Sequence, residues 1–236
     1  MRFSIARQKR TVPSHFETEL AALKEKLLIM ASHAEGAVNR ALRALIRRDD
    51  ELARRTREED TIIDRLEIEI DDAAIRLLEQ KPASFELRLI TVAMKISHNL
   101  ERVGDEATTI SRRCLELSRE PRLPQQPDLP RMAGLALEML KEALDAFVHR
   151  APEKARPLIA RDEEVDALNK QFQQELTRCM AQNAETITRC LNLMVISKSI
   201  ERIADHAKNI AEEAVYLYEG RDIRHIAKPR VAGAAE

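Results

Sequence analysis

The chain has little of what β-sheet proteins are rich in. It contains no Trp, two Tyr, five Phe and five Gly among 236 residues, whereas aromatic residues favour strands and Gly favours tight turns. Leu, Ala, Ile, Glu and Arg dominate instead, and most of these residue types favour helices. A chain of this length buries enough surface to fold without a metal or a disulfide. We therefore predict an all-α fold.

The chain also lacks an excess of acidic or of basic residues, and it has no closely spaced pair of cysteines. Lys and Arg number 39 against 40 Asp and Glu, a net charge of -1, so no overall field attracts nucleic acid. The three cysteines, Cys114, Cys179 and Cys190, form no C-x-x-C pair and lie among apolar positions. We interpret them as small buried side chains in a reducing compartment and not as a metal or redox site.

Long hydrophobic runs are absent as well. Met1–Ser14 carries four basic residues but no apolar stretch of the kind that a secretory signal needs. Elsewhere no apolar run approaches the roughly 20 residues that cross a bilayer, because charges interrupt every helical stretch. We expect a cytoplasmic protein that meets a membrane only through partners.

Apolar periodicity and capping residues predict two sets of three helices. Ser14 and Glu17 form an S-x-x-E capping box, Pro152 suits a first helical turn, and Gly220 suits a C-terminal cap. Pro recurs at every third position from 121 to 130, which favours an extended connector. The expected helices are 14–47, 50–79, 84–119, 131–150, 152–182 and 184–219. The expected domains are a basic tail at 1–13, repeats at 14–120 and 131–220, a linker at 121–130 and a tail at 221–236.

The two sets of helices carry matching sequences. Ile96–Asp105 aligns with Ile196–Asp205 at an offset of 100, and residues 41–64 align with 143–166 at an offset of 102. A match of this length indicates duplication of a three-helix unit. The predicted architecture is therefore two tandem three-helix bundles related by an internal pseudo-two-fold repeat.

Acidic side chains recur in register in both repeats. Each repeat holds two acid pairs spaced by four residues: Asp60 with Asp64, Glu101 with Asp105, Asp162 with Asp166, and Glu201 with Asp205. Such a pair lies on one helix face and costs roughly a few tenths of a kcal/mol, so helix stability does not explain it. If the second and third helices of a unit pack antiparallel, four carboxylates converge. An oxygen-rich cluster of this kind suits Mg²⁺, Mn²⁺ or iron.

The surroundings of these acids differ between the repeats. Glu101 and Asp105 lie nearly opposite the apolar stripe of their helix, so we expect a surface site and not core groups. Glu67 extends the acidic face of the first repeat, where the second repeat has Asn169, while Asn209 extends the face of the second. Two metal sites would therefore differ in affinity.

Metal-free interpretations of the acid pairs stay open. Acid pairs on exposed helix faces often serve only to keep a helix soluble. Arg102 and Arg202 follow the glutamates directly and can pair with the acids in a purely structural network. His98 and His206 lie beside the motifs but are not repeated, so we do not count them among the expected ligands.

Four segments of the chain resemble segments of a known family. Leu100–Asp105 and Ile200–Glu212 resemble the paired E(D)-x-x-x-D signatures of the PhoU family of phosphate-uptake regulators. Pro82–Met94 resembles the family's entry to the third helix, and Tyr216–His225 resembles its usual ending. The resemblance covers about residues 14–226, which is almost the whole chain.

The resemblance implies a cytoplasmic, often dimeric regulator without known catalysis. Such a regulator restrains the phosphate ABC transporter, through its ATPase subunit, and helps a phosphate-sensing histidine kinase to read phosphate sufficiency. Family members bind metal clusters through the acid motifs, and Mg, Mn, Zn or Fe are the candidate metals. Thr109 departs from the pattern, because it replaces the amide found in the second repeat. The implied metal ligands are Asp60, Asp64, Glu101, Asp105, Asp162, Asp166, Glu201, Asp205 and Asn209.

Two alternative functions are compatible with the same helices. A metalloenzyme would employ the acid clusters for two-metal chemistry. The chain lacks the E-x-x-H motifs of di-iron bundles, a Gly-rich phosphate loop and a nucleophile elbow, so we expect no catalysis. A metal-free helical adaptor, which serves this or another phosphate transporter through its charged faces, is the second alternative.

Overall fold

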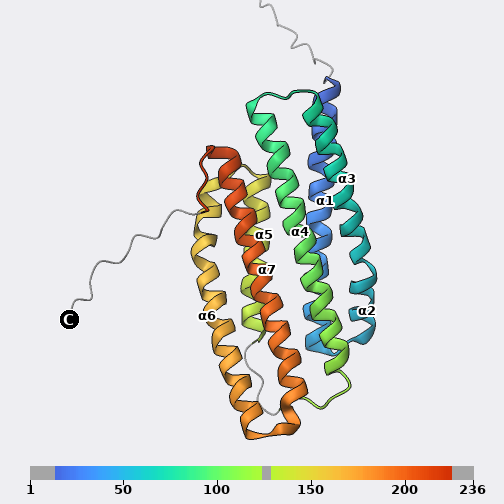
Figure 1. The fold of residues 1–236 in the computed structure, drawn as a ribbon, viewed down its shortest axis with the longest axis vertical. Coiled ribbons are helices and arrows are strands. Elements are labelled where there is room, and N and C mark those ends of the chain that lie inside the picture. The colour runs from blue at the N-terminus through green and yellow to red at the C-terminus, as the bar shows by residue number, and fades with distance from the viewer. Residues whose placement is uncertain (1–13, 124–128, 225–236) are drawn as a thin grey trace, which may run out of the picture.

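Long helices make up nearly all of the described chain (Figure 1). The computed structural model describes residues 14–123 and 129–224, so the tails expected at 1–13 and beyond 224 lie outside it, as does much of the expected linker. Within those ranges there is no strand, and the predicted all-α class is confirmed. None of the described helices has an apolar stretch long enough to cross a membrane.

In the described residues each half of the chain supplies three long helices, and the first half adds one short helix, α2. The first half contains α1 (His15–Arg47), α2 (Asp50–Glu58), α3 (Asp60–Glu79) and α4 (Ser84–Leu117). The second half contains α5 (Leu129–Val148), α6 (Pro152–Gln182) and α7 (Ile187–Glu219), with a short 3₁₀ turn (Ala184–Thr186) before α7.

Capping residues explain several helix ends. Glu17 N donates to Ser14 Oγ at 3.2 Å, and Ser14 N donates to the Glu17 carboxylate at 2.7 Å, so the predicted capping box is present. Pro152 is the first residue of α6, and Gly220 ends α7 with a φ of 69°. These three predictions are confirmed. Helix α5 starts two residues before the expected position and holds Pro130 in its first turn.

The helix expected over 50–79 is two helices that meet at Glu59. The Glu59 carboxylate accepts a hydrogen bond from Arg55 Nε at 2.6 Å and pairs with Arg40 of α1 at 2.9 Å. The prediction of one unbroken helix is wrong, because the chain makes a tighter turn at Glu59, whose carbonyl accepts from Ile62 N at 3.1 Å, and apolar periodicity does not reveal this turn. The interruption makes Asp60 the first residue of α3.

Helices α4 and α7 lie side by side at the centre of the molecule and run antiparallel (Figure 1). Their register is fixed by contacts along the pair, for example from Arg88 to the Leu217 carbonyl at 3.4 Å and from Arg202 to Glu106 at 3.1 Å. Helices α1 and α3 pack on α4, while α5 and α6 pack on α7. The two predicted three-helix units therefore meet through their third helices.

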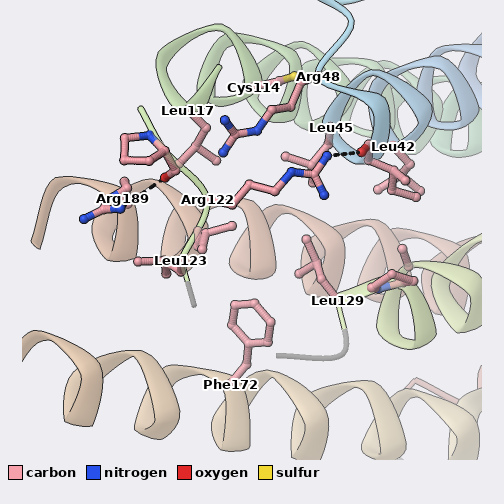
Figure 2. A pocket seen from close by; sticks show the side chains of 15 residues that line it. Leu42, Leu45, Arg48, Cys114, Leu117, Arg122, Leu123, Leu129, Phe172 and Arg189 are labelled. Atoms are coloured by element: carbon pink, nitrogen blue, oxygen red, sulfur yellow. Dashed lines mark hydrogen bonds between the residues drawn. The ribbon is translucent and has the colours of Figure 1, made fainter. Parts of the chain in front are cut away.

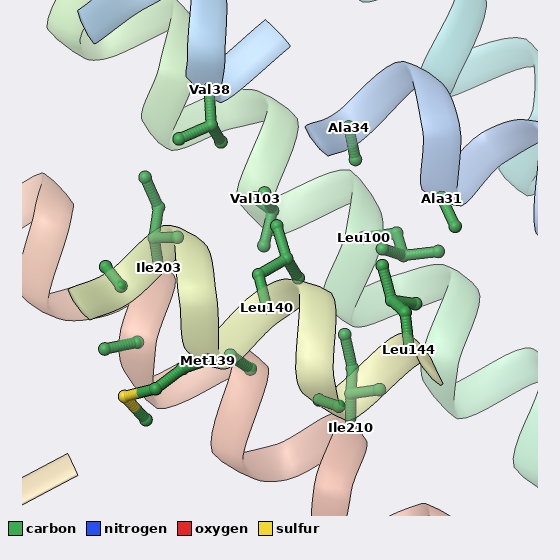
Figure 3. Close-up of a cluster of buried hydrophobic side chains, with 14 of the residues drawn as sticks. Ala31, Ala34, Val38, Leu100, Val103, Met139, Leu140, Leu144, Ile203 and Ile210 are labelled. Atoms are coloured by element: carbon green, nitrogen blue, oxygen red, sulfur yellow. The ribbon is translucent and has the colours of Figure 1, made fainter. Parts of the chain in front are cut away.

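The two halves share one hydrophobic core (Figure 3). Val38 of α1 and Leu100 and Val103 of α4 pack in the same cluster as Leu140 of α5 and Ile203 of α7. Each of these five side chains is at most 1% exposed. Full burial of a side chain of this kind contributes about 1.5–3 kcal/mol. Separation of the halves would therefore expose the centre of the core.

An apolar cavity of about 140 Å³ lies at one end of the molecule, where both halves contribute to its wall (Figure 2). Leu117, Leu123 and Phe172 are among its lining residues. Three arginines around it donate hydrogen bonds to backbone carbonyls and so fasten neighbouring segments together. The pairs are Arg48 to Glu120 at 2.6 Å, Arg122 to Ile46 at 3.2 Å and Arg189 to Pro121 at 3.1 Å.

Close packing of α3 on α4 depends on Gly104. A Cβ atom at this position would lie 2.9 Å from Asp60 Oδ1 and 3.0 Å from Ile63 Cδ1. A larger side chain must displace the Asp60 and Ile63 side chains or push α3 away, so we expect Gly104→Val to lower the free energy of unfolding by about 1–3 kcal/mol. Urea denaturation followed by circular dichroism measures this change.

Gly134 of α5 provides the matched control, because a Cβ atom there meets no heavy atom within 4 Å. Gly134→Ala restricts the unfolded chain and suits the helix, so it should raise the unfolding free energy by up to about 1 kcal/mol. Equal destabilisation by both substitutions would contradict the close approach at Gly104.

Candidate metal centre

Helices α3 and α4 bring the acids of the first half together. Asp60 begins α3 and Asp64 follows one turn later, while Glu101 and Asp105 lie on the adjacent face of α4. Burial raises the pKa of Asp60, and the charges of Asp64 and Asp105 raise it further, whereas the Thr108 hydroxyl beside it acts in the opposite direction. Asp60, Asp64 and Asp105 are therefore close enough for their charges to interact, whereas the charge that acts on Glu101 from α3 is that of Glu67.

Among the described residues, Glu67, His98 and Glu101 form the one group of donors close enough to share a metal ion, and of the predicted ligands only Glu101 belongs to it. His98 Nδ1 lies 3.2 Å from Glu67 Oε1, and one donor atom from each of the three residues lies within 4.8 Å of the others. One imidazole nitrogen with two carboxylate oxygens suits first-row divalent ions. Sequence reasoning did not count His98 as a ligand, because the equivalent position is Lys198. The proximity of His98 to α3 was the missing signal.

The surroundings of Glu101 disfavour the charged form of its carboxyl group. Burial first, and the Asp105 charge second, raise the pKa of Glu101 to about 7. Its Oε2 atom is buried and lacks a hydrogen bond, although Arg102 Nε lies 3.2 Å away. The side chain of Asp105 is 47% exposed and that of Glu101 only 16%. Both residues are therefore partly buried, Glu101 more deeply than Asp105, and neither is a core group.

Arg102 reaches both acids of the α4 motif from the solvent side. Its guanidinium lies 3.2 Å from Glu101 and 3.2 Å from Asp105, and its side chain is 50% exposed. The structural network that the sequence left open is therefore present in part. An exposed ion pair of this kind contributes about 0–1 kcal/mol, so it does not offset the burial of Glu101.

Lysines neutralise the equivalent cluster in the second half. Lys208 Nζ pairs with Asp162 and also lies 3.3 Å from Asp205, while Lys198 Nζ lies 2.5 Å from Glu201. Asp162 and Glu201 are 4% and 7% exposed. Burial raises the pKa of both carboxyls, and the lysines oppose that rise. Sequence reasoning missed these lysines, although each lies three residues from an acid of the α7 motif.

The remaining two candidate ligands of the second half lie apart from each other. Asp166 of α6 lies close enough to Glu201 for its charge to raise the pKa of that carboxyl. Asn209 instead donates to Asn99 Oδ1 at 3.2 Å, and His206 Nδ1 lies 3.0 Å from the same oxygen. These hydrogen bonds place Asn209 at the contact between α4 and α7.

A groove of about 720 Å³ runs along that contact. Glu67 and His98 line it from the first half, and Lys208, Glu212 and Glu213 line it from the second. Two of the three donor residues, Glu67 and His98, therefore line a groove that can admit a hydrated ion and leave water molecules in its coordination shell.

Comparison with known proteins finds relatives along nearly the whole chain. The PhoU domain family matches residues 27–114 and 129–214, one segment in each half. The phosphate-specific transport system accessory protein PhoU homolog of Pseudomonas aeruginosa is 37% identical over 227 residues, which cover 95% of this chain and 94% of that protein. The accessory protein PhoU of Escherichia coli is 30% identical over 216 residues, covering 91% and 90%.

Solved structures agree with these matches. The crystal structure of PhoU from Pseudomonas aeruginosa has a TM-score of 0.85 at 37% identity and covers 88% of this chain and 100% of its own. That of the phosphate transport system regulatory protein PhoU from Streptococcus pneumoniae has a TM-score of 0.82 at 29% identity, with coverage of 89% and 99%. Both the sequence and the fold thus show that the chain belongs to the PhoU family.

Proposed function

We propose that the chain is an accessory protein of the phosphate-specific transport system and a negative regulator of phosphate uptake. The observation that supports this most strongly is the match, across both halves, to relatives named as accessory proteins of that system. The regulator acts by protein contact, with the ATPase subunit of the phosphate ABC transporter and a phosphate-sensing histidine kinase as partners. It works as a homodimer and catalyses no reaction.

The second part of the proposal is that metal ions bind at the acid clusters and stiffen the bundle. Fit to a cation is supported by the imidazole and carboxylate donors of Glu67, His98 and Glu101, whose ligand atoms lie within 4.8 Å of one another. Glu67 and Asp60 belong to α3, whereas His98 and Glu101 belong to α4. An ion held by both helices would tie them together. The candidate metals are Mg, Mn, Zn and Fe.

A notch between the halves suits contact with a partner. Leu28 of α1, Phe85 of α4 and Val148 of α5 surround a hollow of about 120 Å³ and are 42%, 44% and 42% exposed. Lys24 and Arg150 also line the notch. Burial and the charge of Arg150 both lower the pKa of Lys24. A partner segment that combines a bulky apolar side chain with an acidic one would fill the hollow and relieve the repulsion between these cations.

Capture of the two partners tests the proposed function directly. We expect the purified chain to retain the transporter ATPase subunit in a pull-down and the double variant Leu28→Ser, Phe85→Ser to lose at least tenfold in affinity. Leu191 of α7 is 52% exposed and does not line the notch, so Leu191→Ser is the matched control. The unaltered chain failing to bind both the ATPase and the kinase would contradict the proposed function.

Elemental analysis tests the metal part of the proposal. Protein purified without chelators and then loaded with Mn²⁺ or Zn²⁺ should retain metal in stoichiometric amount after desalting. The double variant Asp105→Asn, Asp205→Asn removes one acid from each α4 and α7 motif and should retain far less. Background metal in both proteins, combined with intact partner binding, would favour the metal-free adaptor.

Glu101 gives the metal-free protein a distinct pH dependence. Its pKa rises from 4.5 in the unfolded chain to about 7 in the folded protein, so the folded state holds this proton more tightly. The resulting stability is present below about pH 4.5 and is lost as the pH rises through about 7. With a chelator present, unfolding free energy should fall over this window in the unaltered chain and fall less in Glu101→Gln. Parallel urea-denaturation profiles would contradict the burial of Glu101.

A further inference from the structure

The two halves carry the same acids but neutralise them by different means. At the offset of 100 between α4 and α7, His98 corresponds to Lys198 and Thr108 corresponds to Lys208. At the offset of 102 between α3 and α6, Glu67 corresponds to Asn169. Each difference removes a donor atom from the second half or adds a fixed positive charge to it.

In the second half, Lys208 takes the central place among the carboxylates. It pairs with Asp162 of α6 and Asp205 of α7, which is the bridging role that a metal ion would have. Lys208 is 26% exposed, and its partner Asp162 has a side chain only 6% exposed. Burial lowers the pKa of Lys208, but its bonds to the two acids outweigh burial and raise it. A divalent ion would have to displace this charged lysine.

The first half has no lysine at either equivalent position. The Thr108 hydroxyl lies where Lys208 would reach, and His98 lies within 3.2 Å of Glu67. Arg102, whose side chain is half exposed, pairs through Nε with the buried Glu101 Oε2 at 3.2 Å and also with Asp105. Glu67, His98 and Glu101 therefore keep three donor atoms facing one another from two helices.

We propose that this chain binds its metal in the first half alone, with His98 as a ligand beside Glu67 and Glu101, while Lys198 and Lys208 take the place of metal in the second half. This inference rests on the metal binding put forward in the proposed function. The bound ion is a first-row transition metal such as Mn²⁺, Fe²⁺ or Zn²⁺, because an imidazole ligand disfavours Mg²⁺. The duplicated acid motifs thus provide one metal site in this chain and not two.

A transplant of the first-half residues into the second half tests the inference by gain of binding. The triple variant Asn169→Glu, Lys198→His, Lys208→Thr places the first-half side chains around Asp162 and Glu201. After loading with Zn²⁺ and desalting, we expect its metal content to reach twice that of the unaltered chain. The reciprocal variant, His98→Lys with Thr108→Lys, should lose the metal and retain the helical content seen by circular dichroism.

Removal of acids from one half at a time provides matched controls. Asp162→Asn with Asp205→Asn should leave the metal content unchanged, whereas Glu67→Gln with Glu101→Gln should abolish it. A readout for the imidazole comes from Cu²⁺-loaded protein, where electron spin-echo spectroscopy detects a coordinated ring nitrogen. That signal should vanish in His98→Gln and persist in His206→Gln.

The outcomes distinguish failure of the one-site inference from failure of the metal binding put forward in the proposed function. Loss of half the metal on removal of the second-half acids would overturn the one-site inference and leave metal binding intact. Persistence of the nitrogen signal in His98→Gln would overturn the role of His98. Background metal in every variant, the transplant included, would defeat both the inference and the metal part of the proposed function, while partner capture would still test regulation.

Discussion

The antiparallel packing of α4 against α7 is the constraint on which the remaining structure depends. Leu100, Val103 and Ile203 are fully buried in this pair, and the other long helices pack around it. Because the core is continuous across the pair, the halves are not free to behave as separate domains. The same register brings Asn99 of α4 against His206 and Asn209 of α7 and forms the groove along the contact of the two helices.

Much of this arrangement could be predicted from the sequence. The capping box at Ser14 and the cap at Gly220 involve residues that are close together in the chain, so they can be recognised without the tertiary structure. The repeat can be recognised by aligning the chain with itself. The interruption at Glu59 could not be found in this way, because it is a single tighter turn with a near-helical backbone. Apolar periodicity records which face of a helix is buried and carries no information on such a turn.

The candidate site shows the same division between local and long-range information. The acids at i and i+4 were evident from the chain, but the place of His98 beside Glu67 depends on how α3 packs on α4. The degree to which Glu101 is buried also depends on that packing, since angular position on one helix ignores the cover supplied by the next. Lys208 combines both kinds of information. Its spacing of three residues from Asp205 is evident in the sequence, but its ion pair with Asp162 of α6 appears only in the folded structure.

The cavity ringed by Arg48, Arg122 and Arg189 has a consequence of a different kind. Its 140 Å³ belong to the folded protein's volume and are eliminated when water enters or the surrounding segments separate. Hydrostatic pressure therefore acts on this end of the molecule more strongly than on the closely packed centre. Compression would loosen the contacts that these three arginines make around the cavity, while the α4–α7 pair still holds.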